Sequence, residues 1–119
     1  PLDAGFRPAT PGIENPVVVR SQDKQWWISV YHIYTGATIG VSYSQDGLHW
    51  VRQAGDLQLG DSFCGDSVTT ACGLVPEPSK GKGVYSLLYT ASGKCSSGLC
   101  ESENVCRAFL INTAERDAL

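Results

Sequence analysis

The chain contains no methionine, only two histidines, and no cysteine before Cys64 among its 119 residues. Helical bundles usually draw on Leu, Met, Ala and Glu. This sequence instead has 13 Gly, 6 Pro, 3 Trp and 5 Tyr, which favour short strands joined by tight turns. We therefore expect an all-β protein. With 42 % hydrophobic residues, the chain is long enough for one domain with its own core.

Charged residues are also scarce, at 18 % of the chain, and leave a formal net charge of -3. No cluster of Lys or Arg stands out, so we expect no nucleic-acid partner. The longest apolar runs, such as Pro16–Val19, are far too short to cross a bilayer, which predicts no membrane span. The segment Pro1–Thr10 lacks the basic flank and apolar centre of a secretory signal. We expect a soluble chain from which any targeting segment has been removed or left out.

All the cysteines fall in the C-terminal half of the sequence. Their spacings differ from the paired two-residue spacing of a zinc ribbon, and neither histidine lies nearby. We therefore predict disulfides rather than a metal site, expect no cofactor, and place the protein in a secreted or other oxidising, lumenal compartment. An odd total leaves at least one cysteine unpaired or bonded to a partner outside the chain. The five are Cys64, Cys72, Cys95, Cys100 and Cys106.

The region Asn15–Gln53 divides into four strand-sized segments, PVVVRS, QWWISVYHIY, TIGVSYSQ and LHWVRQ. The breaks between them, at Ser21–Lys24, Thr35–Ala37 and Asp46-Gly47, consist of turn-favouring residues. Asp-Gly between strands predicts a two-residue type I′ hairpin, which needs positive φ at both central positions. Four sequential strands form an up-and-down meander.

Three further strand-like segments, SVTTACGLVPE, VYSLLYTAS and VCRAFLINTA, repeat this pattern with a period near fifty residues. Four-stranded units at that period are typical of β-propeller blades. We predict a blade over residues 13–53, a linker over 54–66, and an incomplete blade over 67–119 that carries a Cys-rich insert at 91–105. A small β-sandwich is the alternative, although its strands usually need Greek-key crossings. The expected fourth strand of the second unit is missing, so we expect the chain to be part of a larger protein.

Three motifs of the first unit are Glu14-Asn15-Pro16, the aromatic-rich Trp26–Tyr34, and Ser44–Trp50 with its Ser-x-Asp-Gly-x-x-Trp pattern. Together they resemble blades of the five-bladed propellers of the arabinanase, levansucrase and invertase group, which includes family 43 and family 32 glycoside hydrolases. The resemblance covers residues 12–52 well and residues 67–113 loosely. It implies a partial five-bladed propeller whose substrate pocket lies at the mouth where the innermost strands begin.

In an antiparallel pair, the start of the first strand lies beside the end of the second, so we expect Glu14 near Tyr31, His32 and Tyr34. Glycoside hydrolysis needs two carboxyl groups, one of them a proton donor. The resemblance implies that Glu14 is this general acid, favoured by desolvation among aromatics and apolar Ile13. Asp66 is the candidate second carboxylate. His32 and Tyr34, with Trp27 as a stacking surface, are the candidate substrate-binding residues.

Each of these residues also has a structural alternative. Glu14 could accept backbone hydrogen bonds in a turn, and His32 could be a partly buried histidine with its hydrogen bonds satisfied. Trp26 and Trp27 face opposite ways along a strand, so only one can meet a ligand, and both could pack between blades. The functional prediction is carbohydrate hydrolysis or binding at the propeller mouth, with the missing blades or other protein chains as partners. The alternative is a non-catalytic propeller that serves as a structural or protein-interaction subunit.

The Asp-Gly hairpin lies at the opposite end of the predicted blade from Glu14. We expect Asp46 to accept hydrogen bonds from turn amides, Gly47 to supply positive φ, and Trp50 to cover the gap between adjacent sheets. These three residues are therefore predicted to be scaffold.

Overall fold

A computed structural model describes residues 12–33, 38–57, 59, 67–92 and 103–118. The first sheet has the order β1-β2-β3-β4, all antiparallel and in chain order. Its strands are β1 (Ile13–Arg20), β2 (Trp27–Ile33), β3 (Thr38–Ser44) and β4 (Val51–Arg52). The predicted four-stranded meander is confirmed, but the fourth strand is only two residues long.

The second sheet has the order β5-β6-β7 and is again antiparallel. Its strands are β5 (Ser67–Pro76), β6 (Val84–Ser92) and β7 (Glu103–Ile111), with a 3-10 turn η1 (Pro78–Lys80) between β5 and β6. A short helix, α1 (Thr113–Arg116), follows β7 and was not predicted. Both sheets connect neighbouring strands only, without crossings. The all-β prediction is confirmed, and the described residues form two open sheets.

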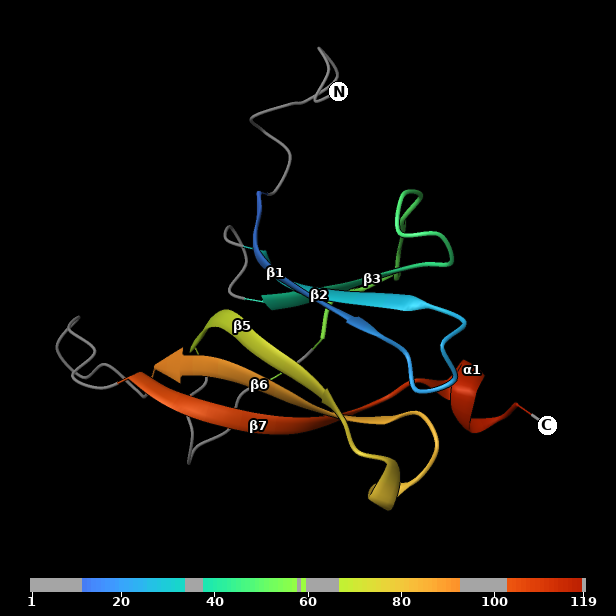
Figure 1. Ribbon diagram of the computed structural model, residues 1–119. Coiled ribbons are helices and arrows are strands. Elements are labelled where there is room, and N and C mark those ends of the chain that lie inside the picture. The colour runs from blue at the N-terminus through green and yellow to red at the C-terminus, as the bar shows by residue number, and fades with distance from the viewer. Residues whose placement is uncertain (1–11, 34–37, 58, 60–66, 93–102, 119) are drawn as a thin grey trace, which may run out of the picture.

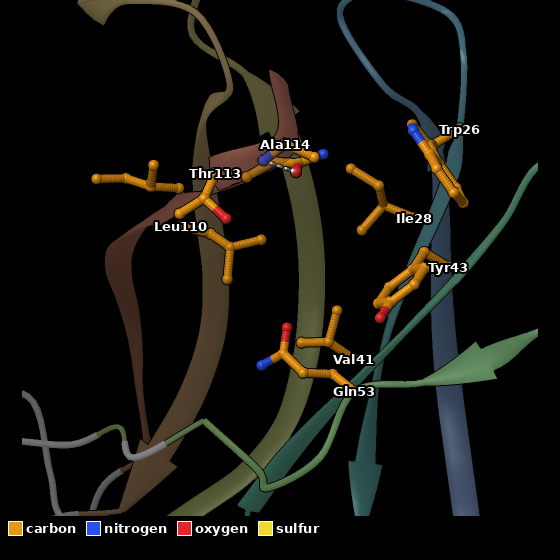
Figure 2. Close-up of a pocket in the computed structure, with 10 residues that line it drawn as sticks. Trp26, Ile28, Val41, Tyr43, Gln53, Leu110, Thr113 and Ala114 are labelled. Atoms are coloured by element: carbon orange, nitrogen blue, oxygen red, sulfur yellow. Dashed lines mark hydrogen bonds between the residues drawn. The ribbon is translucent and has the colours of Figure 1, made fainter. Parts of the chain in front are cut away.

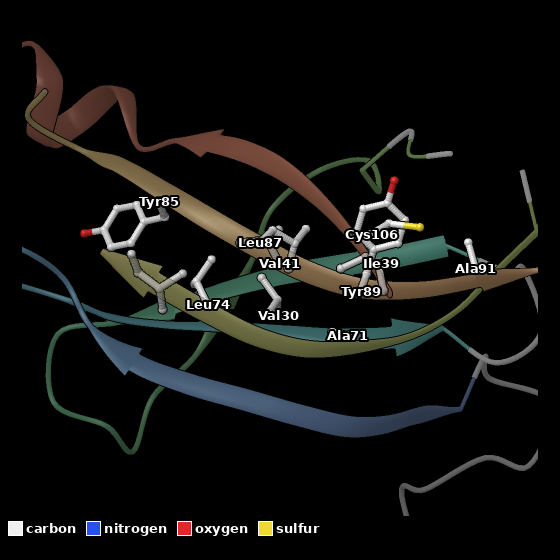
Figure 3. Close-up of a cluster of buried hydrophobic side chains, with 11 residues drawn as sticks. Val30, Ile39, Val41, Ala71, Leu74, Tyr85, Leu87, Tyr89, Ala91 and Cys106 are labelled. Atoms are coloured by element: carbon white, nitrogen blue, oxygen red, sulfur yellow. The ribbon is translucent and has the colours of Figure 1, made fainter. Parts of the chain in front are cut away.

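The two sheets stack face to face, with β5 lying across β1, β2 and β3 (Figure 1). Alternate residues of β2, β3, β6 and β7 face this interface, as the two-residue period of a strand requires, whereas a register shift in β5 puts its core residues Ala71 and Leu74 three positions apart. Val30, Ile39 and Leu87 are at most 1 % exposed, and burial of each such side chain contributes about 1.5–3 kcal/mol. Figure 3 shows the cluster between the layers; its members are Ile28, Val30, Ile39, Val41, Ala71, Leu74, Tyr85, Leu87, Tyr89, Ala91 and Cys106.

A polar connection joins the sheets at one end of this core. The hydroxyl of fully buried Tyr85 accepts a hydrogen bond from the Gln22 amide (2.8 Å) and donates one to Glu115 Oε2 (2.5 Å). Glu115, itself 3 % exposed, also accepts from the Asp23 amide at 2.9 Å through Oε1. Burial, reinforced by the bond to Glu115, raises the pKa of Tyr85. The connection between β1 and β2 is thus held against β6 and α1.

The Ser44–Trp50 segment differs from the expected two-residue turn. Gly47 has a φ of +77°, but Asp46 does not have positive φ, so the predicted type I′ geometry is wrong. The paired residues nearest the turn are Tyr43 and Val51, which leaves a longer loop between β3 and β4. The cause is the Asp46 side chain, which accepts hydrogen bonds from amides further along the loop. These bonds take the place of the backbone hydrogen bond of a tight two-residue turn.

Tyr85→Phe should lower the free energy of unfolding by about 1–3 kcal/mol, because it leaves the Gln22 amide and the Glu115 carboxylate without their shared partner. Urea denaturation followed by circular dichroism measures this change. Tyr43→Phe is the matched control, since the Tyr43 hydroxyl takes part in none of the hydrogen bonds among the described residues. Equal stability of the two variants would contradict the role assigned to Tyr85.

Candidate functional site

A β-bulge shapes β1 where the predicted acid lies. The register of β1 on β2 shifts between Glu14 and Val17, so β1 has one more residue than β2 in this stretch. Asn15 and Pro16 occupy the bulge, where a proline without an N–H is tolerated. Asn15 has a φ of +52°, in the left-handed region that Asn enters more readily than most residues. The bulge therefore sets the backbone on which Glu14 is displayed.

Glu14 and His32 form a cross-strand pair. They are register partners, and His32 Nδ1 lies 2.9 Å from Glu14 Oε1. The His32 side chain is 10 % exposed and the Glu14 side chain 51 %. When Nδ1 carries its hydrogen, the buried imidazole donates to the carboxylate and fixes its orientation. One carboxylate oxygen is thus held by the protein, and a half-exposed carboxyl group remains open to a ligand.

The pair lies at one end of the interface between the sheets. His32 pairs with core residue Ile39, so it is on the face of β2 that packs against the second sheet. The C-terminal end of β5 lies at the other end of this interface, because Pro76 pairs with Tyr85, which contacts Gln22. The N-terminal end of β5 therefore lies on the same side as Glu14, and β1 and β5 run in the same direction.

Tyr31 supports this strand end from the opposite face. Its ring lies over Gly40 on β3, where an added Cβ would collide with the ring. Its hydroxyl lies 2.8 Å from Ser42 Oγ, which holds the ring along β3. Because Tyr31 directly precedes His32, this packing fixes the backbone that carries the imidazole.

The structure brings Glu14 and His32 together, but Trp27 lies at the other end of β2. Trp27 pairs with Arg20 and Ser44, and the Arg20 guanidinium sits 4.7 Å from the centre of its ring. The predicted substrate-binding Tyr34 and the predicted second carboxylate Asp66 lie outside the described residues. Their roles, like those of the described candidates, remain predictions.

The Ser44–Trp50 loop lies at the Trp27 end, as expected. Asp46 Oδ1 accepts from the Leu48 and His49 amides, both at 2.8 Å, which confirms the predicted turn contacts. The His49 amide and side chain and the Leu48 amide hold the pKa of Asp46 well below its usual range, and Asp46 raises the pKa of His49. Trp50 is 39 % exposed, and its indole N–H donates to the Gly47 carbonyl at 3.1 Å. The loop is therefore a self-contained scaffold, and Trp50 closes the loop itself.

Sequence reasoning missed the region around α1, which closes the far end of the interface. Asn112 caps the helix by accepting from the Ala114 amide at 3.1 Å, and Glu115 comes three residues later. An Asn followed at that spacing by Glu is a recognised helix-start signal, so this helix could have been predicted.

No protein-family model, no curated protein and no solved structure matches this chain. Among the described residues there is no group of three or more His, Cys, Asp and Glu placed to hold a metal ion. Nor does the described part of the chain contain a helix long and apolar enough to span a membrane. The contact between Glu14 and His32 is therefore the observation on which a function for this end of the fold can be argued.

Asn15→Ala should destabilise the protein by up to about 1–2 kcal/mol, because alanine has the Cβ that makes a left-handed backbone costly but lacks the polar side chain that lets Asn adopt it. Asn15→Gly, which has no Cβ, should lose less stability. Denaturant titration measures both variants. In the alanine variant we also expect weaker nuclear Overhauser contacts between the Glu14 and His32 side chains. Identical stability and contacts in the two variants would show that the bulge does not depend on Asn15.

Proposed function

We propose that this chain is part of a glycoside-hydrolase-type β-propeller and that Glu14 and His32 belong to its carbohydrate site. The observation that carries the proposal is their 2.9 Å contact at a strand end, with the carboxyl group half exposed and the imidazole buried. A carboxylate accepts hydrogen bonds from sugar hydroxyls, and an imidazole can either donate to them or accept from them. The resemblance of the first blade to the arabinanase, levansucrase and invertase group supplies the substrate class.

In the proposed reaction, protonated Glu14 gives its proton to the glycosidic oxygen as the bond from that oxygen to the sugar carbon breaks. His32 Nδ1–H donates a hydrogen bond to Oε1 of the carboxyl group, which orients the group and leaves Oε2 to face the glycosidic oxygen. Water attacks the sugar carbon, and its proton passes to a second carboxylate about 6.5–9.5 Å away in an inverting enzyme. Asp66 is our candidate for this base.

The desolvation expected around Glu14 is absent from the described residues. Its side chain is 51 % exposed, and neighbouring Ile13 is 54 % exposed. A proton-donating carboxyl group needs an environment that disfavours its charge. The proposal therefore requires further protein to cover this end, such as the additional blades of a closed propeller.

The arrangement of the two sheets supports the propeller. Each sheet is a meander in chain order, β1 and β5 run in the same direction, and β5 lies across the first sheet. Successive propeller blades repeat such a unit around an axis. In this arrangement Glu14 lies at the mouth on the side where β1 and β5 begin.

The predicted disulfides and oxidising compartment belong to the same proposal. Cys106, 3 % exposed on the core face of β7, is the half-cystine that we assign to such a bond. Its candidate partners Cys64, Cys95 and Cys100 lie outside the described residues. A bond to one of them would tie β7 to another part of the chain and would place the protein in a secreted or lumenal setting.

Glu14→Gln should lower the rate of oligosaccharide hydrolysis by about a hundredfold or more in the native protein that carries this chain, because the amide cannot donate a carboxyl proton. Arabinan, xylan and fructan oligosaccharides are the substrates, and release of reducing sugar is the measurement. Glu77→Gln is the matched control, since its carbonyl can still accept the bond from Ser86 that Glu77 accepts at 2.8 Å. Unchanged hydrolysis in Glu14→Gln would remove the proposed catalytic role.

The outer face of the second sheet favours the alternative, a non-catalytic propeller that acts as an interaction subunit. On β7, Val105 is 72 %, Phe109 51 % and Ile111 50 % exposed, and alternate spacing puts all three on one face. Lys80 and Arg107 place their cations 6.0 Å and 5.0 Å from the Phe109 ring centre. Apolar faces of this kind commonly mark contact surfaces, and here another sheet is the proposed partner.

Phe109→Lys should then shift the native protein from assembly to free chain, because a charge in an apolar interface is costly. Native mass spectrometry measures the assembled fraction. Lys82→Ala, at an exposed turn, is the control and should leave assembly unchanged. A wild-type protein that is monomeric and without any partner would exclude this alternative.

A further inference from the structure

A cavity of about 260 Å³ opens between the two sheets at the end opposite Glu14 (Figure 2). The first sheet supplies one wall from β2, β3 and the residue after β4, and β7 with α1 supplies the other. Its apolar part consists mainly of Ile28, Val41 and Leu110. The cavity is separate from the Glu14 and His32 site, and ligand binding there is independent of the proposed function.

Two aromatic rings form a corner of this cavity. Trp26 and Tyr43 meet edge to face, with ring centres 5.7 Å apart and planes at 87°. Both residues are half-buried, so each keeps part of its ring surface accessible. Ring faces of this kind contact the C–H surfaces of a flat or puckered ring ligand.

Four uncharged polar groups surround the same space and lack a protein partner among the described residues. They are the Tyr43 hydroxyl, the Gln53 side-chain amide, the Asn112 Nδ2 group and the Thr113 hydroxyl. Asn112 uses its Oδ1 to cap α1 by accepting from the Ala114 amide, which leaves its NH₂ group available. Figure 2 shows Tyr43, Gln53 and Thr113 around the cavity. Donors and acceptors are therefore both offered to a ligand.

The lining excludes two classes of ligand. It contains no Asp, Glu, Lys, Arg or His, so a charged ligand would lose its hydration without gaining a counter-charge. A wholly apolar ligand would cover the half-buried Tyr43 hydroxyl and Asn112 NH₂ group without pairing them, which is unfavourable for both groups. A neutral ring that carries hydroxyl groups on its edge and C–H groups on its face satisfies both conditions.

We infer that this cavity binds a neutral sugar ring, stacked in the corner of Trp26 and Tyr43 and hydrogen-bonded to Gln53, Asn112 and Thr113. Its volume lies just below the range of about 300–1,000 Å³ for drug-sized ligands, which suits a single ring. The site is a binding site, because the lining holds no carboxyl group, imidazole or thiol that could act as acid, base or nucleophile.

Titration of the ¹⁵N-labelled chain with glucose, galactose, mannose, arabinose, xylose and fructose tests this inference. The three tryptophan indole N–H signals are resolved by nuclear magnetic resonance and assigned with single Trp→Phe variants. We expect at least one sugar to move the Trp26 signal saturably, while the Trp27 and Trp50 signals stay in place. Thr113→Val and Gln53→Leu should each weaken binding about two- to tenfold, the effect of one lost hydrogen bond.

Two controls separate this site from the one at Glu14. Gln45→Leu removes an exposed amide outside the cavity and should leave the affinity unchanged. Glu14→Gln should also leave the Trp26 response unchanged, even if it abolishes hydrolysis. No saturable Trp26 shift with any of the six sugars would overturn the inference. So would a response to indole alone, or a sugar response that neither Thr113→Val nor Gln53→Leu weakens.

Discussion

The face-to-face contact between the two sheets is the constraint on which the other features depend. Apolar side chains from alternate positions fill its middle, and the Tyr85 hydroxyl closes one end by joining Gln22 to Glu115. A buried hydroxyl with both partners in place permits one relative position of the layers, since any slip would leave a carboxylate or an amide unpaired. Because the layers have one relative position, the side chains at both ends of the interface are also held in fixed positions.

The two ends of this interface differ in chemistry. At one end, a bulge in β1 and the ring of Tyr31 hold Glu14 beside His32, so a titratable pair faces the edge of the sheets. At the other end, Trp26 and Tyr43 form an aromatic corner among uncharged groups. The same short sheets thus present a carboxylate–imidazole pair at one end and an uncharged, partly aromatic cavity at the other. A single fold can hold both the pair and the cavity, because the core fixes the positions of the strand ends without burying them.

Much of this arrangement can be predicted by applying local rules to the sequence. Antiparallel pairing was enough to place Glu14 beside His32 and the Asp46-Gly47 turn at the other end, and alternation was enough to separate Trp26 from Trp27. Turn type was predicted wrongly, because a side-chain carboxylate replaced the backbone contact of a two-residue hairpin.

Long-range contacts were beyond sequence reasoning. Tyr85 and Glu115 are 30 positions apart, and Tyr85 meets Gln22 across 63 positions. No sequence periodicity predicts such contacts. The cavity is equally unpredictable, because its lining comes from both sheets and from α1. The expected burial of Glu14 was wrong for the same reason. Burial depends on which segments cover the strand end in space, and the Glu14 side chain is half exposed.

The cations beside Phe109 have a consequence for how this chain behaves in concentrated solution. Among the described residues β7 is an edge strand, and an exposed edge is a template to which a second copy can add, extending the sheet into a fibre. Arg107 and Lys80 would bring like charges together in such a stack. Such repulsion would oppose the growth of a fibre from this strand.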